Sequence, residues 1–134
     1  TTLFRSCEDK KISGRVVYTD RLAPLSEEFG NNILELLKKN SDLDGIFATS
    51  DVMAANIIRA CKKMGKRVPE DISIVGFDDT WISTLTYPSI TTIHQPVQEM
   101  CEYAIEAIVK KVKGEKVPSQ VVFPVELIDR ESTK

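Results

Sequence analysis

The sequence predicts an α/β fold in which a parallel sheet is flanked by helices. Segments with the apolar spacing of a helix alternate with short segments that are apolar at every position. Strands of this second kind are buried on both faces, which is typical of a parallel sheet covered by helices. The length of 134 residues suits one domain with a substantial core.

The first part of the chain is expected to contain two helices and one strand. We expect a helix over Thr2–Lys11 and a short apolar strand over Arg15–Tyr18. Ser26 is suited to cap the next helix, because a serine hydroxyl can accept the free N–H groups of a first turn. One face of that helix carries Phe29, Ile33, Leu36 and Leu37.

The central part is expected to supply two buried strands and the helix between them. A strand over Gly45–Thr49 leads into a helix that Asp51 can cap and that Gly65 ends. The inward face of this helix carries Ala54, Ile57, Ile58 and Cys61. The second strand is expected over Ile72–Phe77.

Each central strand ends at a pair of polar residues. Ser50 and Asp51 follow the first strand, and Asp78 and Asp79 follow the second. Ligands of parallel α/β sheets bind beyond the carboxyl ends of the strands. This rule makes the two polar pairs the leading candidates for a binding site.

The pattern changes after Pro88. Thr91–Ile93 is expected to be an extended link, and Val97–Val112 a strongly amphipathic helix with acidic residues near its start and lysines at its end. A last strand is expected over Gln120–Ile128. Pro124 lies inside it and has no N–H to donate, so the strand should lie at a sheet edge or be bulged there.

The composition argues against several classes of function. A net charge of −2 without a basic stripe is unlike a nucleic-acid-binding domain, and no apolar run is long enough to span a membrane. The three cysteines are far apart and there is one histidine, so no metal site is expected. We expect Cys61 and Cys101 to be buried free thiols, which fits the cytoplasm. Neither G-x-G-x-x-G nor a P-loop occurs, so no cofactor is expected.

Four segments in register carry a family resemblance. They are DGIFATSDVMA, GKRVPEDISIVGFDD, YPSITTIHQP and FPVELIDREST, and together with the intervening chain they extend from about Leu3 to Thr133. In order and spacing they resemble the LacI/GalR repressors. The resemblance implies one lobe of a periplasmic-binding-protein-like type I fold. Residues 1–134 would form the C-terminal lobe of the effector-binding domain, with 91–114 a crossover and a helix that belong to an absent first lobe.

The resemblance also implies a function. The chain would belong to the effector-sensing domain of a cytoplasmic bacterial repressor, which binds a sugar or a related small molecule and is not an enzyme. The protein would be a homodimer and would contact operator DNA only through an absent N-terminal helix-turn-helix. An effector-binding arginine of the family would lie immediately before Thr1, outside the chain.

Four residues are candidates for contact with the effector. In the family the first acid of the GFDD segment, here Asp78, accepts hydrogen bonds from effector hydroxyls, although a loop-capping acid is the alternative. Ser50 stands where many relatives have asparagine, or it is a turn serine. Gln95 follows the crossover and either reaches the cleft or is a hinge amide. Trp81 either stacks on a sugar ring or lies in a subunit interface.

Other polar residues near these positions are expected to have structural roles. Asp79 is expected to cap the short turn over Thr80–Leu85, and Asp51 to cap its helix. His94 has no serine or cysteine partner that would indicate catalysis. The family also implies a dimer interface, with plain solvent exposure as the alternative. Its residues would be Ala55, Arg59, Lys62, Ile82 and Thr86.

Two other functions compete with the repressor. A secreted or periplasmic sugar-binding protein of a transporter would have nearly the same fold, but the GFDDT and TTIHQP segments look more like repressors. An enzyme or a phosphoacceptor module could use Asp51, Asp78 and Asp79 to hold Mg²⁺. No lysine or threonine is recognisably placed to contact a phosphate, which argues against that class.

The apolar stripe of the helix over Val97–Val112 requires another apolar surface to pack against. In a complete protein the first lobe would provide it. In this chain alone, we expect the helix either to fold back on its own sheet or to pair with a second copy, since large exposed apolar patches favour association.

Overall fold

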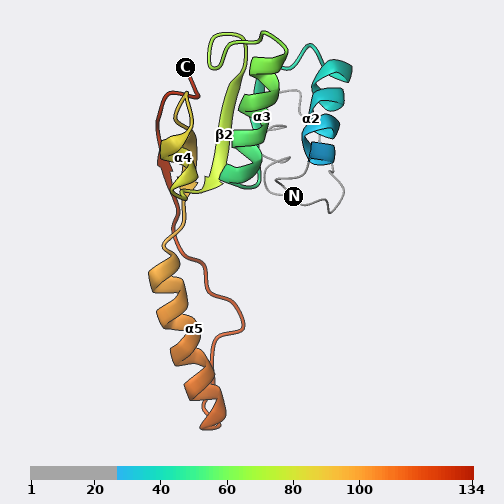
Figure 1. Ribbon diagram of the computed structural model, residues 1–134. Coiled ribbons are helices and arrows are strands. Elements are labelled where there is room, and N and C mark those ends of the chain that lie inside the picture. Colours follow the sequence, from blue (N-terminus) through green and yellow to red (C-terminus); the bar gives the residue numbers. More distant parts are fainter. Residues whose placement is uncertain (1–26) are drawn as a thin grey trace.

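The structure is a computed structural model that describes residues 27–134 (Figure 1). The helix expected over Thr2–Lys11, the strand expected over Arg15–Tyr18 and the expected cap Ser26 lie outside the described residues. Within the described part of the chain, no helix is long and apolar enough to cross a membrane.

A four-stranded sheet forms the centre of the described fold. Strands β1 (Gly45–Phe47), β2 (Ser73–Asp78) and β3 (Thr91–His94) run parallel, and β4 (Glu126–Ile128) pairs with β3 in the antiparallel direction. The strand order is β1-β2-β3-β4. This arrangement confirms the predicted α/β fold with a parallel sheet flanked by helices.

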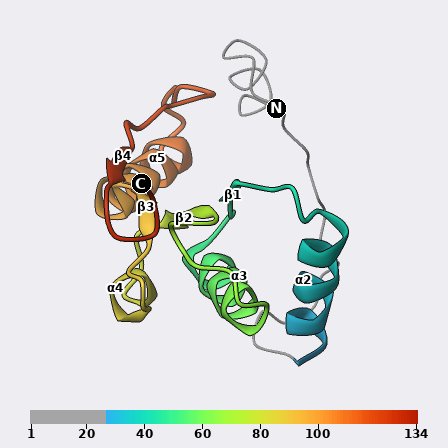
Figure 2. The ribbon, with the colours of Figure 1, turned by 90° about the horizontal axis from the view of Figure 1, so that it is seen from above.

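The core lies between the sheet and two helices. Helix α2 (Glu27–Lys39) packs against α3 (Asp51–Lys63), and α3 packs against β2 (Figure 2). The predicted inward faces of both helices are confirmed. The buried side chains that they contribute are Phe29, Ile33, Leu37, Ala54, Ile57, Ile58, Ala60 and Cys61, and the sheet and its flanks add Ala48, Ile72, Ile74 and Ile90.

Helix α3 begins with a different cap from the one predicted. The Ser50 hydroxyl accepts the backbone N–H of Met53 at 3.2 Å, and the extended backbone of Ser50 is the conformation that an N-cap requires. Asp51 is not the cap, because its side chain turns inward and is fully buried. The helix ends at Lys63 with Met64 as its C-cap, and Gly65, the residue predicted to end it, follows with a φ of +72° that favours glycine.

Gly76 lies where β2 passes directly over the buried carboxylate of Asp51. A Cβ at this position would lie 2.5 Å from Asp51 Oδ1 and 3.0 Å from Ile90 Cγ2. We therefore expect Gly76→Ala to lower the free energy of unfolding by about 3 kcal/mol, measured by urea denaturation. Gly30→Ala is the matched control, because nothing lies within 4 Å of its added Cβ in helix α2. Equal stability of the two variants would contradict this packing.

The turn between α3 and β2 contains an acid that is sensitive to pH. The Arg67 guanidinium donates to Asp71 (Nη2 to Oδ1, 2.7 Å) and the Arg67 backbone N–H donates to Oδ2 at 2.8 Å. These hydrogen bonds lower the pKa of Asp71 from its ordinary value of 3.8 to about 2.

Acid is expected to remove the contribution of Asp71 to stability. Because its pKa is lower in the folded state than in the unfolded state, the contribution is complete above about pH 4 and is lost towards about pH 2. The melting temperature of Asp71→Asn should therefore lie below that of the wild type at neutral pH. The gap should close as the pH falls through this window, whereas a gap that does not change with pH would argue against the assignment.

Two strands are shorter or more exposed than predicted. The strand expected over Gln120–Ile128 is reduced to β4, which begins two residues after Pro124 at the edge of the sheet. The proline has no N–H for the ladder, so pairing starts beyond it. Strand β1 was expected to be buried, but Gly45 and Phe47 are exposed, because β1 pairs with β2 on one side and is an edge of the described sheet.

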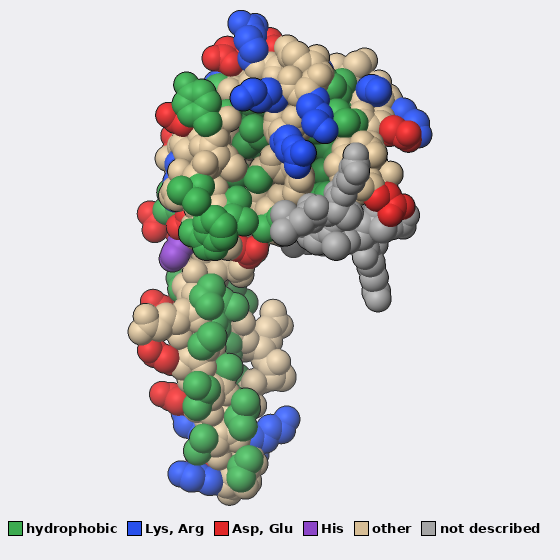
Figure 3. Space-filling model, in the orientation of Figure 1, with side chains coloured by type: hydrophobic (Ala, Val, Ile, Leu, Met, Phe, Trp, Pro, Cys, Tyr) green, Lys and Arg blue, Asp and Glu red, His purple; other side chains and the backbone are tan. Residues whose placement is uncertain are grey.

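Helix α5 (Val97–Val112) has the predicted bounds but does not fold back on the sheet. It projects away from the rest of the described fold, and none of its residues is buried (Figure 1). Cys101, predicted to be buried, is exposed for this reason. Figure 3 shows apolar side chains along the visible face of α5. The exposed apolar residues of the helix include Val97, Met100, Ile105, Ile108, Val109 and Val112.

Candidate functional site

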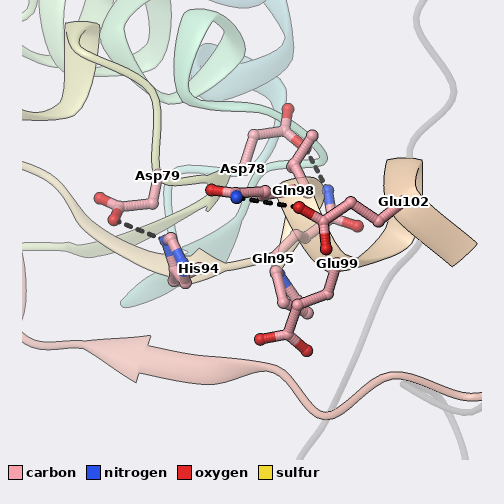
Figure 4. Close-up of a pocket in the computed structure, with 9 residues that line it drawn as sticks. Asp78, Asp79, His94, Gln95, Gln98, Glu99 and Glu102 are labelled. Atoms are coloured by element: carbon pink, nitrogen blue, oxygen red, sulfur yellow. Dashed lines mark hydrogen bonds and ion pairs between the residues drawn. The ribbon is translucent and has the colours of Figure 1, made fainter.

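An open hollow of about 570 Å³ lies where β2 and β3 end and α5 begins (Figure 4). It is at the carboxyl ends of parallel strands, the edge at which the sequence predicts a binding site. Polar and charged side chains dominate its wall. The lining residues are Asp78, Asp79, His94, Gln95, Pro96, Val97, Gln98, Glu99 and Glu102.

Asp78 and Gln95 meet in this hollow. Asp78 is the last residue of β2, and Gln95 directly follows β3. The parallel register places Asp78 beside His94, so that the next side chain along, Gln95, donates from Nε2 to Asp78 Oδ1 at 2.7 Å. Within the described part of the chain, this is the hydrogen bond that the Asp78 carboxylate accepts. A polar ligand can therefore use its second oxygen.

The backbone after β2 has an uncommon conformation. Asp78 has φ +99° and Asp79 has φ +52°, and both values lie in the left-handed region that favours glycine. Such residues cost about 1–3 kcal/mol each and persist where the surrounding structure holds them. The loop therefore depends on the contacts of its side chains.

Asp79 supplies most of those contacts. Its Oδ1 accepts Arg130 Nη2 at 2.6 Å and the Ser83 hydroxyl at 3.4 Å, and its Oδ2 lies 3.0 Å from His94 Nδ1. Burial acts to raise the pKa of Asp79, but the hydrogen bonds and positive charges of Arg130 and His94 together lower it below its ordinary value. Asp79 therefore joins three segments of the chain as an ionised carboxylate at neutral pH.

The turn that Asp79 was expected to cap is held by Asp51 instead. Helix α4 (Ile82–Leu85) follows Thr80, whose backbone N–H donates to Asp51 Oδ2 at 2.6 Å and whose hydroxyl donates at 2.9 Å. Asp51 Oδ1 accepts the hydroxyl of Thr92 in β3. Asp79 contributes only its contact with Ser83 to α4, so the prediction for Asp79 was wrong in this detail.

Of the four predicted contact residues, the structure brings two together. Asp78 and Gln95 line the hollow, whereas Ser50 caps α3 and Trp81 is 71% exposed outside the lining. Ser50 and Trp81 remain predictions as ligand contacts. Gln98, Glu99 and Glu102 also line the hollow but were not predicted as site residues. The feature of the sequence that could have identified them is the polar face of the first turns of α5. On this face Gln98 Nε2 donates to Glu102 Oε1 at 3.0 Å.

The residues predicted for a dimer interface differ in exposure. Arg59 and Lys62 are exposed on the outer side of α3, as expected, but Ala55 is half-buried and packs against the core. Ile82 and Thr86 are half-buried at the two ends of α4. The interface remains a prediction for all five.

Comparison with known proteins identifies the domain family. Residues 5–133 match the family described as periplasmic binding protein-like domain. The chain is 37% identical over 100 residues to the ribose operon repressor of Halalkalibacterium halodurans, an alignment that covers 74% of this chain and 30% of the repressor. It is 42% identical over 101 residues to the HTH-type transcriptional regulator MalR of Clostridium butyricum, with 75% and 30% covered. The chain thus spans about 30% of the length of these curated relatives.

Solved structures agree with this assignment. The complex of the transcriptional regulator CelR with cellobiose has a TM-score of 0.83 and 29% identity, covering 96% of this chain and 39% of that one. A LacI family transcriptional regulator from Arthrobacter sp. FB24, in complex with lactose, has a TM-score of 0.81 and 26% identity, with 98% and 50% covered. The chain therefore belongs to the family of periplasmic binding protein-like domains, in the branch found in LacI-type transcriptional regulators.

Proposed function

We propose that this chain is the C-terminal part of the effector-binding domain of a LacI-type transcriptional repressor whose effector is a sugar. The observation that carries the proposal is the pairing of Asp78 with Gln95 in the hollow at the strand ends. Residues 91–114 are the crossover and a helix of the first lobe. The solved relatives that bind cellobiose and lactose support a carbohydrate effector.

The chemistry of the hollow suits a hydroxyl-rich ligand. A carboxylate such as Asp78 can accept two neighbouring hydroxyl groups, which is how sugars are held with a defined orientation. The amides of Gln95 and Gln98 can donate to a sugar oxygen and accept from a hydroxyl at the same time. A bound sugar would replace the hydrogen bond between Gln95 and Asp78 with bonds of its own.

The position of the hollow suggests how binding becomes a signal. Asp78 belongs to the sheet, whereas Gln98, Glu99 and Glu102 belong to α5. A sugar that contacts both sides favours one angle between the sheet and α5. Such a ligand shifts the equilibrium only if it binds one lobe arrangement better than the other. The protein would be a cytoplasmic homodimer that contacts operator DNA through a helix-turn-helix outside this chain. The changed arrangement of the lobes would alter its affinity for that DNA.

A secreted or periplasmic sugar-binding protein of a transporter would have nearly the same fold, but a specific finding favours the repressor. The two curated relatives described above, which match about three quarters of this chain, are transcriptional regulators. The same finding argues against an enzyme. Of the three acids considered for Mg²⁺, Asp51 is bonded to Thr80 and Thr92 in the interior rather than facing the hollow.

A binding experiment on the whole regulator tests the proposal. The sugars to be titrated calorimetrically are cellobiose and lactose, D-xylulose, whose furanose form is bound in another solved relative, and D-ribose, because one relative is a ribose operon repressor. Operator affinity would be measured with and without each sugar. We expect at least one sugar to bind and to change operator affinity. A regulator that binds none of them, or that binds one without any change in DNA affinity, would contradict the proposed function.

A further inference from the structure

Arg130 connects three segments around the loop that carries Asp78. Its Nη2 donates to Asp79 Oδ1 at 2.6 Å, and its Nη1 donates to the Ser83 hydroxyl at 3.0 Å and to the Ile90 carbonyl at 2.9 Å. The side chains of Arg130 and Asp79 are each only 18% exposed. The guanidinium therefore ties the end of β2, helix α4 and the start of β3 to one point.

The backbone of Arg130 is itself fixed to the sheet. Its N–H donates to the Thr91 hydroxyl at 2.9 Å, just beyond the paired part of β4. Arg130 is not among the residues that line the hollow. Of the groups that the Arg130 side chain contacts, Asp79 is the one that lines the hollow, so Asp79 is the direct link between Arg130 and a bound molecule.

Asp79 directly follows Asp78 and is held by side chains from two other segments. The two residues are adjacent and both have positive φ values, so their backbone needs outside contacts to keep this conformation. The Asp79 carboxylate is held by Arg130 on one oxygen and by His94 on the other, and its N–H lies 3.4 Å from the Thr92 hydroxyl. With Asp79 fixed at these points, Asp78 faces Gln95.

We propose that Arg130 is a positioning residue for the effector site, because it fixes Asp79 and thereby orients the carboxylate of Asp78. This inference rests on the proposed function. It assigns a role to a side chain that touches no ligand. Its removal should weaken sugar binding without removing any group that contacts the sugar.

The geometry requires arginine rather than any cation. The planar guanidinium sends Nη2 to a carboxylate and Nη1 to a hydroxyl and a carbonyl, in three directions that a lysine ammonium cannot reproduce. Lysine at this position would keep the charge beside Asp79 and lose part of the hydrogen bonding. We expect Arg130→Lys to bind sugar less tightly than the wild type and more tightly than Arg130→Met.

The charges around Asp79 provide a second, independent readout. The titratable groups nearest Asp79 are Arg130 after β4, His94 at the end of β3 and the neighbouring Asp78. Asp51 of α3 lies on the other side of the Thr92 hydroxyl, and Glu99 and Glu102 of α5 line the same hollow. Without Arg130, burial and His94 remain, and the pKa of Asp79 rises. Sugar affinity should then begin to fall at a higher pH on acidification than it does in the wild type. A merely structural loss would not move this limb of the pH profile.

The experiment uses the whole regulator and the sugar of the four named above that binds the wild type most tightly. Arg130→Met should lower its affinity at least about tenfold, with the far-ultraviolet circular dichroism unchanged. Arg67→Met is the matched control, because Arg67 also pairs with an aspartate but is 70% exposed in the turn after α3. This control should bind within about twofold of the wild type.

A double-mutant cycle tests the route through Asp79. In an Asp79→Ala background, Arg130→Met should change the affinity by no more than about twofold, because alanine offers Arg130 no acceptor and the connection is already lost. Arg130→Met with wild-type affinity would overturn the proposal, provided that Asp78→Asn loses binding. If Asp78→Asn also binds normally, the proposed site itself is wrong. If Arg130→Met does not fold, Arg130→Lys decides the question, and wild-type affinity in that variant would overturn the proposal.

Discussion

Replacement of Asp51 by alanine is expected to lower the free energy of unfolding by more than about 3 kcal/mol. The Asp51 side chain is fully buried and accepts hydrogen bonds from the Thr92 hydroxyl and from both the backbone N–H and the hydroxyl of Thr80. Alanine leaves these three donors without a partner. An unsatisfied buried donor costs about 1–3 kcal/mol, so the sum is large.

The same contacts explain why the loss of stability in Asp51→Ala should extend beyond the site of the mutation. Asp51 joins the first turn of α3 to β3 and to the segment before α4, so its removal loosens the link between them. Asp44→Ala is the matched control, because Asp44 is exposed just before β1 and should change stability by less than about 0.5 kcal/mol. Urea unfolding of both variants measures the difference. Similar stability losses in the two variants would show that the network around Asp51 is unimportant.

The second large effect concerns binding. Asp78→Asn is expected to weaken sugar binding by roughly 10–100-fold, because hydrogen bonds to charged groups contribute about 1.5–3 kcal/mol. Asparagine keeps the size of the side chain and tolerates the left-handed φ of this position as aspartate does. The unfolding free energy should therefore change by less than about 1 kcal/mol.

Asp44→Asn makes the same chemical change away from the hollow and should leave the sugar affinity unchanged. Calorimetric titration of the whole regulator with cellobiose, lactose, D-xylulose and D-ribose compares the two variants with the wild type. If Asp78→Asn binds as tightly as Asp44→Asn, the carboxylate of Asp78 does not hold the sugar.

The apolar periodicity of the sequence correctly predicted the helices that pack in the core. The apolar faces of α2 and α3 are the faces that pack, because an apolar stripe on a helix has no other stable position in water. The bounds of α5 were also predicted, although the residues of its apolar stripe are exposed in the described fold. This apolar periodicity indicates that one face of α5 is suited to packing against another surface. Neither the sheet nor the rest of the described chain supplies that surface.

Local sequence could not decide between Ser50 and Asp51 as the cap of α3. Both residue types can cap a helix, and they are adjacent in the sequence. The choice depends on Thr80 and Thr92, which lie 29 and 41 residues further along the chain and hold the aspartate in the interior. Tertiary hydrogen bonds therefore overrode two equal local preferences.

The candidate site was predictable where it depends on strand ends. Asp78 follows from the rule for parallel sheets, and the register of β2 and β3 then brings Gln95 to it. The role of Arg130 was not predictable, because it depends on a contact with Asp79 across 51 residues. No local pattern distinguishes that arginine from an exposed one such as Arg67.

The most direct test of the central claim is a crystal structure of the whole regulator with the sugar that binds it most tightly. Sugar hydroxyls should lie within hydrogen-bond distance of the Asp78 carboxylate, with the Gln95 amide turned towards the sugar. Arg130 should still hold Asp79 as it does here. A sugar bound elsewhere, with Gln95 still bonded to Asp78, would contradict the account.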